Sequence, residues 1–139
     1  MCLSTANYAM AGPKGSKYYD IFLKQQVQLV TNDEEIVINE EGFRLLREID
    51  KEHSIVAAAK NMDISYRKAW GLLRDIEYIL GFRLVGKHRG GKAGGKTYLT
   101  PEGLDLIDAY NVLIKDLNIS VHDTVKAFFN RINEISDRK

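Results

Sequence analysis

The sequence predicts a mainly helical fold with a few short strands, and three observations carry that prediction. Two short helical patterns lie close together between residues 54 and 80, and a glycine-rich basic loop follows at 86–96. A long apolar repeat fills the last part of the chain. Two helices joined by a tight turn and followed by a hairpin form a winged helix-turn-helix. We therefore predict this fold over residues 18–100, with a β-hairpin at its start and a long C-terminal helix after it at 101–136.

The amino-terminal part divides into an arm, a hairpin and a helix. Residues 1–17 are small, polar and glycine-containing, and we expect a disordered arm. Apolar and glutamine residues alternate over 26–29, a turn-rich TNDEE follows, and residues 36–38 are all β-branched, so we expect a hairpin. Asn39 is a suitable N-cap for a helix that runs to about Glu52.

Two further helices are predicted from their caps. Ser54 caps a short alanine-rich helix from Ile55 to about Asn61, and Ser65 caps a longer helix that Gly81 ends. We assign Trp70 to the core, because it adjoins the apolar face of the longer helix. That face consists of Ala69, Leu72, Leu73, Ile76, Ile79 and Leu80.

The wing and the last helix complete the predicted fold. Segments 82–85 and 96–99 are strand candidates on either side of the glycine loop. Thr100 is the expected cap of the last helix and Pro101 its first residue. The weak point of that helix is 118–120, where it could break into two.

Charge is strongly segregated along the chain, although the net charge is only +1. Residues 65–98 hold eight basic side chains against two acidic ones, whereas residues 33–52 hold eight acidic against three basic. This asymmetry suits a protein that presents one face to a polyanion. Double-stranded DNA is therefore the expected partner.

The expected DNA contacts lie on the longer helix and on the loop. Arginine and lysine beyond a helix N-terminus can reach base edges, and glycine lets backbone N–H groups approach phosphates. The simpler alternatives are that these charges only solvate a helix surface and that the loop is a flexible hairpin tip. The predicted DNA-binding residues are Ser54, Ser65, Tyr66, Arg67, Lys68, Arg74, Lys87, His88, Arg89, Gly90, Gly91, Lys92, Gly94, Gly95 and Lys96.

The same loop also matches a nucleotide-binding motif. Residues 90–97 fit G-x-x-x-x-G-K-[ST] letter for letter. A P-loop needs a buried strand before it and a helix that begins at the Lys-Thr pair, whereas a strand end and Pro101 follow here. We therefore expect no ATP or GTP binding, and a nucleotide-binding enzyme stays as a rival hypothesis.

Apolar residues recur every seven positions in the last helix. A repeat sustained over about four heptads favours helix-on-helix packing, most simply between two copies of the chain. We expect a homodimer. The predicted dimerisation residues are Ile107, Tyr110, Ile114, Leu117, Val121, Val125, Phe128, Ile132 and Ile135.

Other site classes are not expected. Cys2 is the only cysteine, and His53, His88 and His122 lie in separate elements, so we predict no metal site. No residue pattern indicates nucleophilic catalysis, and we expect neither a cofactor nor an enzymatic activity. The first residues do not resemble a secretory signal and no segment is apolar enough to span a bilayer, so we expect a cytoplasmic protein.

The residues AAAKNMDISYRKAWGLL, then GGKAGG and LTPEG, resemble the N-terminal domain of the ModE molybdate-dependent regulators. The segment LGFRL is similar to one found in the related LysR-type winged helices. The resemblance spans about residues 25–117 and implies a dimeric transcription regulator that binds a palindromic operator. It assigns recognition-helix roles to Ser65, Tyr66, Arg67 and Lys68, and wing roles to Gly90, Gly91, Gly94 and Gly95.

The chain departs from this family in two ways. Asp63 stands where the family usually has a turn glycine, and aspartate tolerates left-handed geometry better than most residues. Full-length members also carry C-terminal β-domains that bind molybdate, and this sequence has no such segment, so we expect no molybdate binding.

The sequence thus predicts a DNA-binding transcription regulator. The alternative is a winged helix that binds proteins rather than DNA, for which Arg67 and Lys68 would be unimportant.

Overall fold

The computed structural model describes residues 8–9, 15, 17–88 and 96–137. The chain divides into two compact units. One unit is continuous, Val27–Tyr110, and the other combines residues 1–26 with 111–139. The predicted fold class, mainly helical with small antiparallel strands and a long last helix, is confirmed.

The continuous unit begins with the predicted hairpin. Strands β3 (Leu29–Val30) and β4 (Ile36–Ile38) pair antiparallel, with Leu29 opposite Ile38. Helix α1 (Glu40–Glu52) follows at once, and the Asn39 side chain caps it by accepting a hydrogen bond from the Gly42 N–H at 3.0 Å. The predicted cap and end of this helix are both confirmed.

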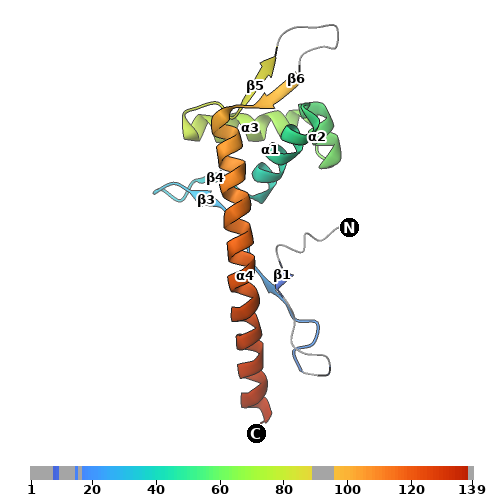
Figure 1. Ribbon diagram of the computed structural model, residues 1–139, viewed down its shortest axis with the longest axis vertical. Helices are drawn as coiled ribbons and strands as arrows, with labels where there is room; N and C mark the ends of the chain where they lie inside the picture. Colours follow the sequence, from blue (N-terminus) through green and yellow to red (C-terminus); the bar gives the residue numbers. More distant parts are fainter. Residues whose placement is uncertain (1–7, 10–14, 16, 89–95, 138–139) are drawn as a thin grey trace. The chain divides into compact units, whose positions relative to one another are not determined.

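The helix-turn-helix has the predicted bounds. Helix α2 spans Ile55–Asn61 and α3 spans Tyr66–Leu80. The Oγ atoms of Ser54 and Ser65 accept hydrogen bonds from the third amide of each helix, at 3.1 and 3.0 Å. In the turn between them Asp63 has φ +56°, the left-handed conformation expected there. Figure 1 shows α1, α2 and α3 gathered together, with a two-stranded ribbon extending from them.

That ribbon consists of β5 (Val85–His88) and β6 (Lys96–Leu99), paired antiparallel from Val85–Leu99 to His88–Lys96. The prediction of a first strand over 82–85 is wrong, because the strand begins only at Val85. The reason is a tertiary contact. The Glu77 carboxylate accepts hydrogen bonds from the Leu84 N–H at 2.6 Å and the Val85 N–H at 3.4 Å, which hold the preceding residues in a turn against α3.

The last helix, α4, is a single helix from Pro101 to Asp137. The Thr100 Oγ1 accepts a hydrogen bond from the Gly103 N–H at 3.1 Å, as expected of the cap. The helix does not break at 118–120. Its first turns, through Tyr110, belong to the continuous unit, and the remainder belongs to the other unit.

The core of the continuous unit joins the three short helices, the strands and the start of α4. Phe43, Leu45, Leu46, Ile49 and Leu73 are almost completely buried. The ring of Tyr110 stacks on Phe43, with centroids 3.6 Å apart and planes 10° apart. This core fixes the orientation of α3 and therefore decides which of its side chains reach the surface.

The other unit contains a short ribbon and most of α4. Strand β1 (Tyr8–Ala9) pairs with β2 (Leu23–Lys24), so these two residues depart from the disordered arm expected over 1–17. The Tyr18 ring lies 6.3 Å from that of Phe129, whose side chain is buried. Residues 1–7, 10–14 and 16 lie outside the described part of the chain.

The predicted dimerisation stripe is partly covered within the chain itself. Ile107, Tyr110 and Val125 are buried, so their assignment to a dimer surface is wrong: Tyr110, for example, already packs on Phe43. Phe128 is 55% exposed. The half-buried members of the stripe are Ile114, Leu117, Val121 and Ile132. The side chain of Ile135 is not among those that the structure describes.

Candidate nucleic-acid interface

Helix α3 has one buried and one open side. Ala69, Leu73 and Ile76 are buried against the core. Every residue predicted on this helix to bind DNA is exposed, so the sequence placed the polar side of the helix correctly. These exposed residues are Ser65, Tyr66, Arg67, Lys68 and Arg74.

Lys68 has a partner in the free protein. Its Nζ lies 3.5 Å from the Glu41 carboxylate on α1, and both side chains are substantially exposed. An exposed ion pair contributes little free energy, so a phosphate can displace Glu41 from Lys68 at small cost. Among the described residues neither Arg67 nor Arg74 has an ion-pair partner, and their charges face solvent.

Trp70 was assigned to the core, and that assignment is wrong. The side chain is only half-buried and lies at the edge of the open side of α3. The Lys87 Nζ of strand β5 lies 5.4 Å from its ring centre, and the Tyr66 ring meets it edge-on at 6.2 Å. The signal in the sequence was the four-residue spacing of Tyr66, Trp70 and Arg74, which puts all three on neighbouring parts of one helix surface.

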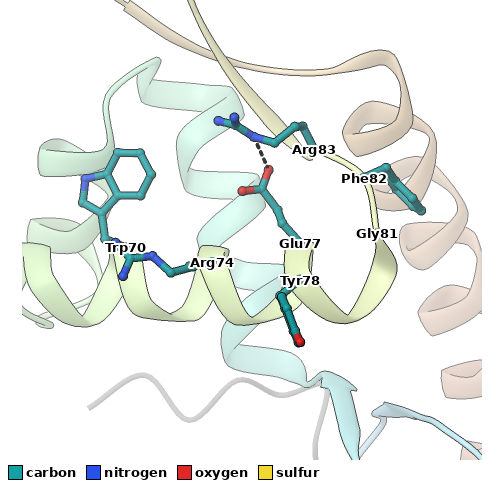
Figure 2. A pocket seen from close by; sticks show the side chains of 7 residues that line it. All are labelled: Trp70, Arg74, Glu77, Tyr78, Gly81, Phe82 and Arg83. Atoms are coloured by element: carbon teal, nitrogen blue, oxygen red, sulfur yellow. Dashed lines mark hydrogen bonds and ion pairs between the residues drawn. The ribbon is translucent and has the colours of Figure 1, made fainter.

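A shallow pocket of about 490 Å³ lies along the second half of α3. In Figure 2 Arg74 extends toward Trp70, whereas Tyr78 points to the opposite side of the helix from Glu77. Glu77 is the anchor of this region. Its side chain is only 12% exposed, and its carboxylate accepts hydrogen bonds from Arg83 Nε at 3.1 Å and from the Leu84 and Val85 amides. The pocket is lined by Trp70, Arg74, Glu77, Tyr78, Gly81, Phe82 and Arg83.

The described part of the wing carries two exposed lysines. Lys87 and Lys96 lie on β5 and β6, and the backbone of His88 pairs with Lys96. The ribbon is tied to α1 because the Thr97 N–H donates to the His53 carbonyl at 2.9 Å. The remaining predicted wing contacts, Arg89, Gly90, Gly91, Lys92, Gly94 and Gly95, lie outside the described residues.

Other kinds of site find little support in the described residues. Lys96 and Thr97 begin strand β6 rather than a helix, which a phosphate-binding P-loop would require. Within the described ranges no three His, Cys, Asp or Glu side chains are placed to share a metal ion. None of the described helices combines the length and apolar character needed to cross a membrane.

Ser54, which was also predicted to bind DNA, serves as the cap of α2 and is half-buried.

Known proteins are similar to this chain over the segment that contains the helix-turn-helix. Residues 41–104 match the family described as "Bacterial regulatory helix-turn-helix protein, lysR family". The transcriptional regulator ModE of Haemophilus influenzae is 36% identical over 87 residues, which are 63% of this chain and 34% of that protein. The molybdenum-pterin-binding protein MopB of Rhodobacter capsulatus is 40% identical over 73 residues, 52% of this chain and 27% of that protein.

The DNA-binding transcriptional dual regulator ModE of Escherichia coli K12 is 38% identical over 69 residues, 50% of this chain and 26% of that protein. The chain thus covers only about a third, or less, of the length of these relatives. A solved complex of the BenM DNA-binding domain with benA site 1 DNA matches 63% of this chain and 92% of that one, with a TM-score of 0.49 and 22% identity.

Proposed function

We propose that this chain is a sequence-specific DNA-binding transcription regulator, because residues 41–104 match the LysR-type helix-turn-helix family and the chain is similar to the ModE regulators. The observation that carries the proposal is the open side of α3. Its arginines face solvent directly beside the wing, as the contact between Lys87 and Trp70 indicates.

Helix α3 is the proposed recognition helix. The major groove of B-DNA is about 12 Å wide and admits one α-helix. Only the side of α3 away from Ala69, Leu73 and Ile76 is available to enter it. Arg67 and Arg74 project from that open side, and arginine can donate two hydrogen bonds to guanine O6 and N7.

We propose that the β5–β6 wing contacts the sugar-phosphate backbone of the DNA. Lys87 and Lys96 supply positive charge at the far end of the paired strands. Arg89 and Lys92 add two basic residues to the sequence between the strands. Lysine contacts to phosphates release counterions, so binding through the wing weakens steeply as salt rises.

Two copies of the chain are proposed to bind a palindromic operator. The dimer contact uses those members of the α4 stripe that the chain leaves partly or fully open, Ile114, Leu117, Val121, Phe128 and Ile132, with Ile135 as a further member. An isologous pair presents two recognition helices related by a two-fold axis, which matches a palindromic site.

The test is selection followed by titration. Wild-type protein selects duplexes from a random library, and fluorescence anisotropy then gives the affinity for the enriched duplex. Arg67→Ala and Arg74→Ala are expected to weaken this affinity by about tenfold each, because each removes a base contact. Arg44→Ala on α1 is the matched control, since Arg44 is also exposed but lies outside α3 and the wing.

The rival is a winged helix that binds a protein partner. It predicts that no duplex is enriched and that binding to any DNA is absent at low salt. An enriched duplex whose affinity is the same for Arg67→Ala, Arg74→Ala and Arg44→Ala would contradict the assignment of α3.

A further inference from the structure

Gly71 lies in the middle of the open side of α3. Helical periodicity places Arg67, Gly71, Arg74 and Tyr78 along one line, opposite the buried residues of the helix. The three flanking side chains are exposed, Tyr78 to 87%. The row of large side chains on this face is therefore interrupted by a gap at its centre.

Nothing in the described part of the chain requires a glycine at this position. A Cβ atom built on Gly71 would meet no atom within 4 Å, and the residue does not have a positive φ. The other helical glycines in the described residues differ. A Cβ on Gly42 would lie 2.8 Å from Ile38 Cγ1, and one on Gly103 would collide with the Leu84 carbonyl oxygen.

A glycine inside a helix also carries a cost. It has more conformational freedom to lose than alanine and weakens the helix. Since the position is open and the backbone is ordinary helix, alanine would stabilise the folded chain here. The residue is therefore explained neither by the packing of the chain nor by its backbone geometry.

We propose that Gly71 is the point at which the backbone of α3 contacts the edges of the base pairs in the major groove. This inference rests on the proposed function. Arg67 lies one turn before the gap, and Arg74 and Tyr78 lie one and two turns after it. Without a side chain between them, the helix can sit deeper in the groove, and the arginines on both sides can reach base edges together. Any side chain at position 71 would hold the helix away from the bases.

The variants Gly71→Ala and Gly71→Leu test this directly. Thermal unfolding of Gly71→Ala should occur about 2–5 °C higher than for wild type, because alanine favours the helix. Its affinity for the duplex that wild-type protein selects from a random library should fall about fivefold or more, and that of Gly71→Leu further. Affinity for a scrambled duplex should change less than about twofold, because phosphate contacts carry that binding.

Ala109→Leu is the matched control. Ala109 is exposed on α4 in the same unit, outside α3 and the wing, so added bulk there should change neither affinity. Selective loss of affinity for the selected duplex, with raised thermal stability, supports the inference.

Unchanged affinity of Gly71→Ala and Gly71→Leu for the selected duplex would overturn the inference while leaving the proposed function intact. A lower unfolding temperature for Gly71→Ala would also overturn it, since the chain itself would then require the glycine. Failure of the wild-type protein to select or bind any duplex would overturn both.

Discussion

The Nζ atom of Lys87 lies 5.4 Å from the centre of the Trp70 ring, and this contact joins strand β5 to helix α3. The Tyr66 ring also contacts this indole, in an edge-on arrangement. A cation over an indole is attracted by the ring quadrupole, and a partly exposed pair contributes about 0.5–1 kcal/mol. The contact thus couples the two elements that the proposed function brings to one duplex.

Replacing Trp70 by leucine should therefore loosen the base of the wing. We expect the affinity for the selected duplex to fall about two- to fivefold, which corresponds to the loss of one such contact. Trp70→Phe, which keeps an aromatic face, should retain most of the affinity. Anisotropy titrations of both variants measure this, and equal affinities of the leucine variant and wild type would exclude a coupling role for the indole.

Glu77 should be a strong determinant of stability. Its shielded carboxylate accepts hydrogen bonds from Leu84, Val85 and Arg83, and Glu77→Ala leaves two partly buried backbone hydrogen bonds without their acceptor. We expect a loss of about 2–3 kcal/mol in the free energy of unfolding, measured by urea denaturation. Asp75→Ala, an exposed acid on the same helix, should stay within about 0.5 kcal/mol of wild type. Similar losses for the two variants would argue against the anchoring role.

Tyr110 should make the stability depend on alkaline pH. Burial raises the pKa of its hydroxyl above 10.0, Glu40 raises it further and Arg47 opposes the shift. The unfolded chain therefore ionises first, so this contribution to stability is complete below about pH 10 and is lost as the pH rises through the folded-state pKa.

The check is a comparison of wild type with Tyr110→Phe. The free energies of unfolding should differ by a constant amount below about pH 9, and wild type should lose stability relative to the variant above about pH 10. Parallel profiles through this range would show that the hydroxyl ionises equally in both states.

Phe128 should be central to the proposed dimer contact. It is 55% exposed on the α4 stripe, and a charge there would be placed inside the contact between two copies. Phe128→Glu should weaken dimerisation about tenfold or more, measured by sedimentation equilibrium. Ile119→Glu is the control, because Ile119 is 60% exposed on the same helix but lies off the stripe. Equal weakening by both variants, or a monomeric wild type, would contradict this contact.

Local signals predicted the helices of this fold almost completely. Ser54, Ser65 and Thr100 cap their helices through their own hydroxyls, and Gly81 ends α3 with φ +81°. Such contacts involve residues three or four positions apart, so a short stretch of sequence contains all the information. The exposed face of α3 followed equally from the spacing of its apolar residues.

The errors all involve contacts between residues distant in sequence. Strand β5 begins late because Glu77, eight residues earlier, binds the Val85 amide. Trp70 lies half-buried beside Lys87 of strand β5, and Tyr110 stacks on Phe43, which lies far from it in the sequence. An apolar repeat shows that a helix face is covered, but it does not show whether the cover is another chain or the same one.

The most direct test of the central claim is an anisotropy titration of wild-type protein with its selected duplex and with a scrambled duplex of equal length. The titrations are made at about 50 and about 200 mM salt, over which phosphate contacts weaken strongly. The proposed function predicts tight binding that weakens steeply with salt, and a preference for the selected duplex of at least about a hundredfold at the higher salt. Equal affinity for the two duplexes, or no binding at the lower salt, would contradict it.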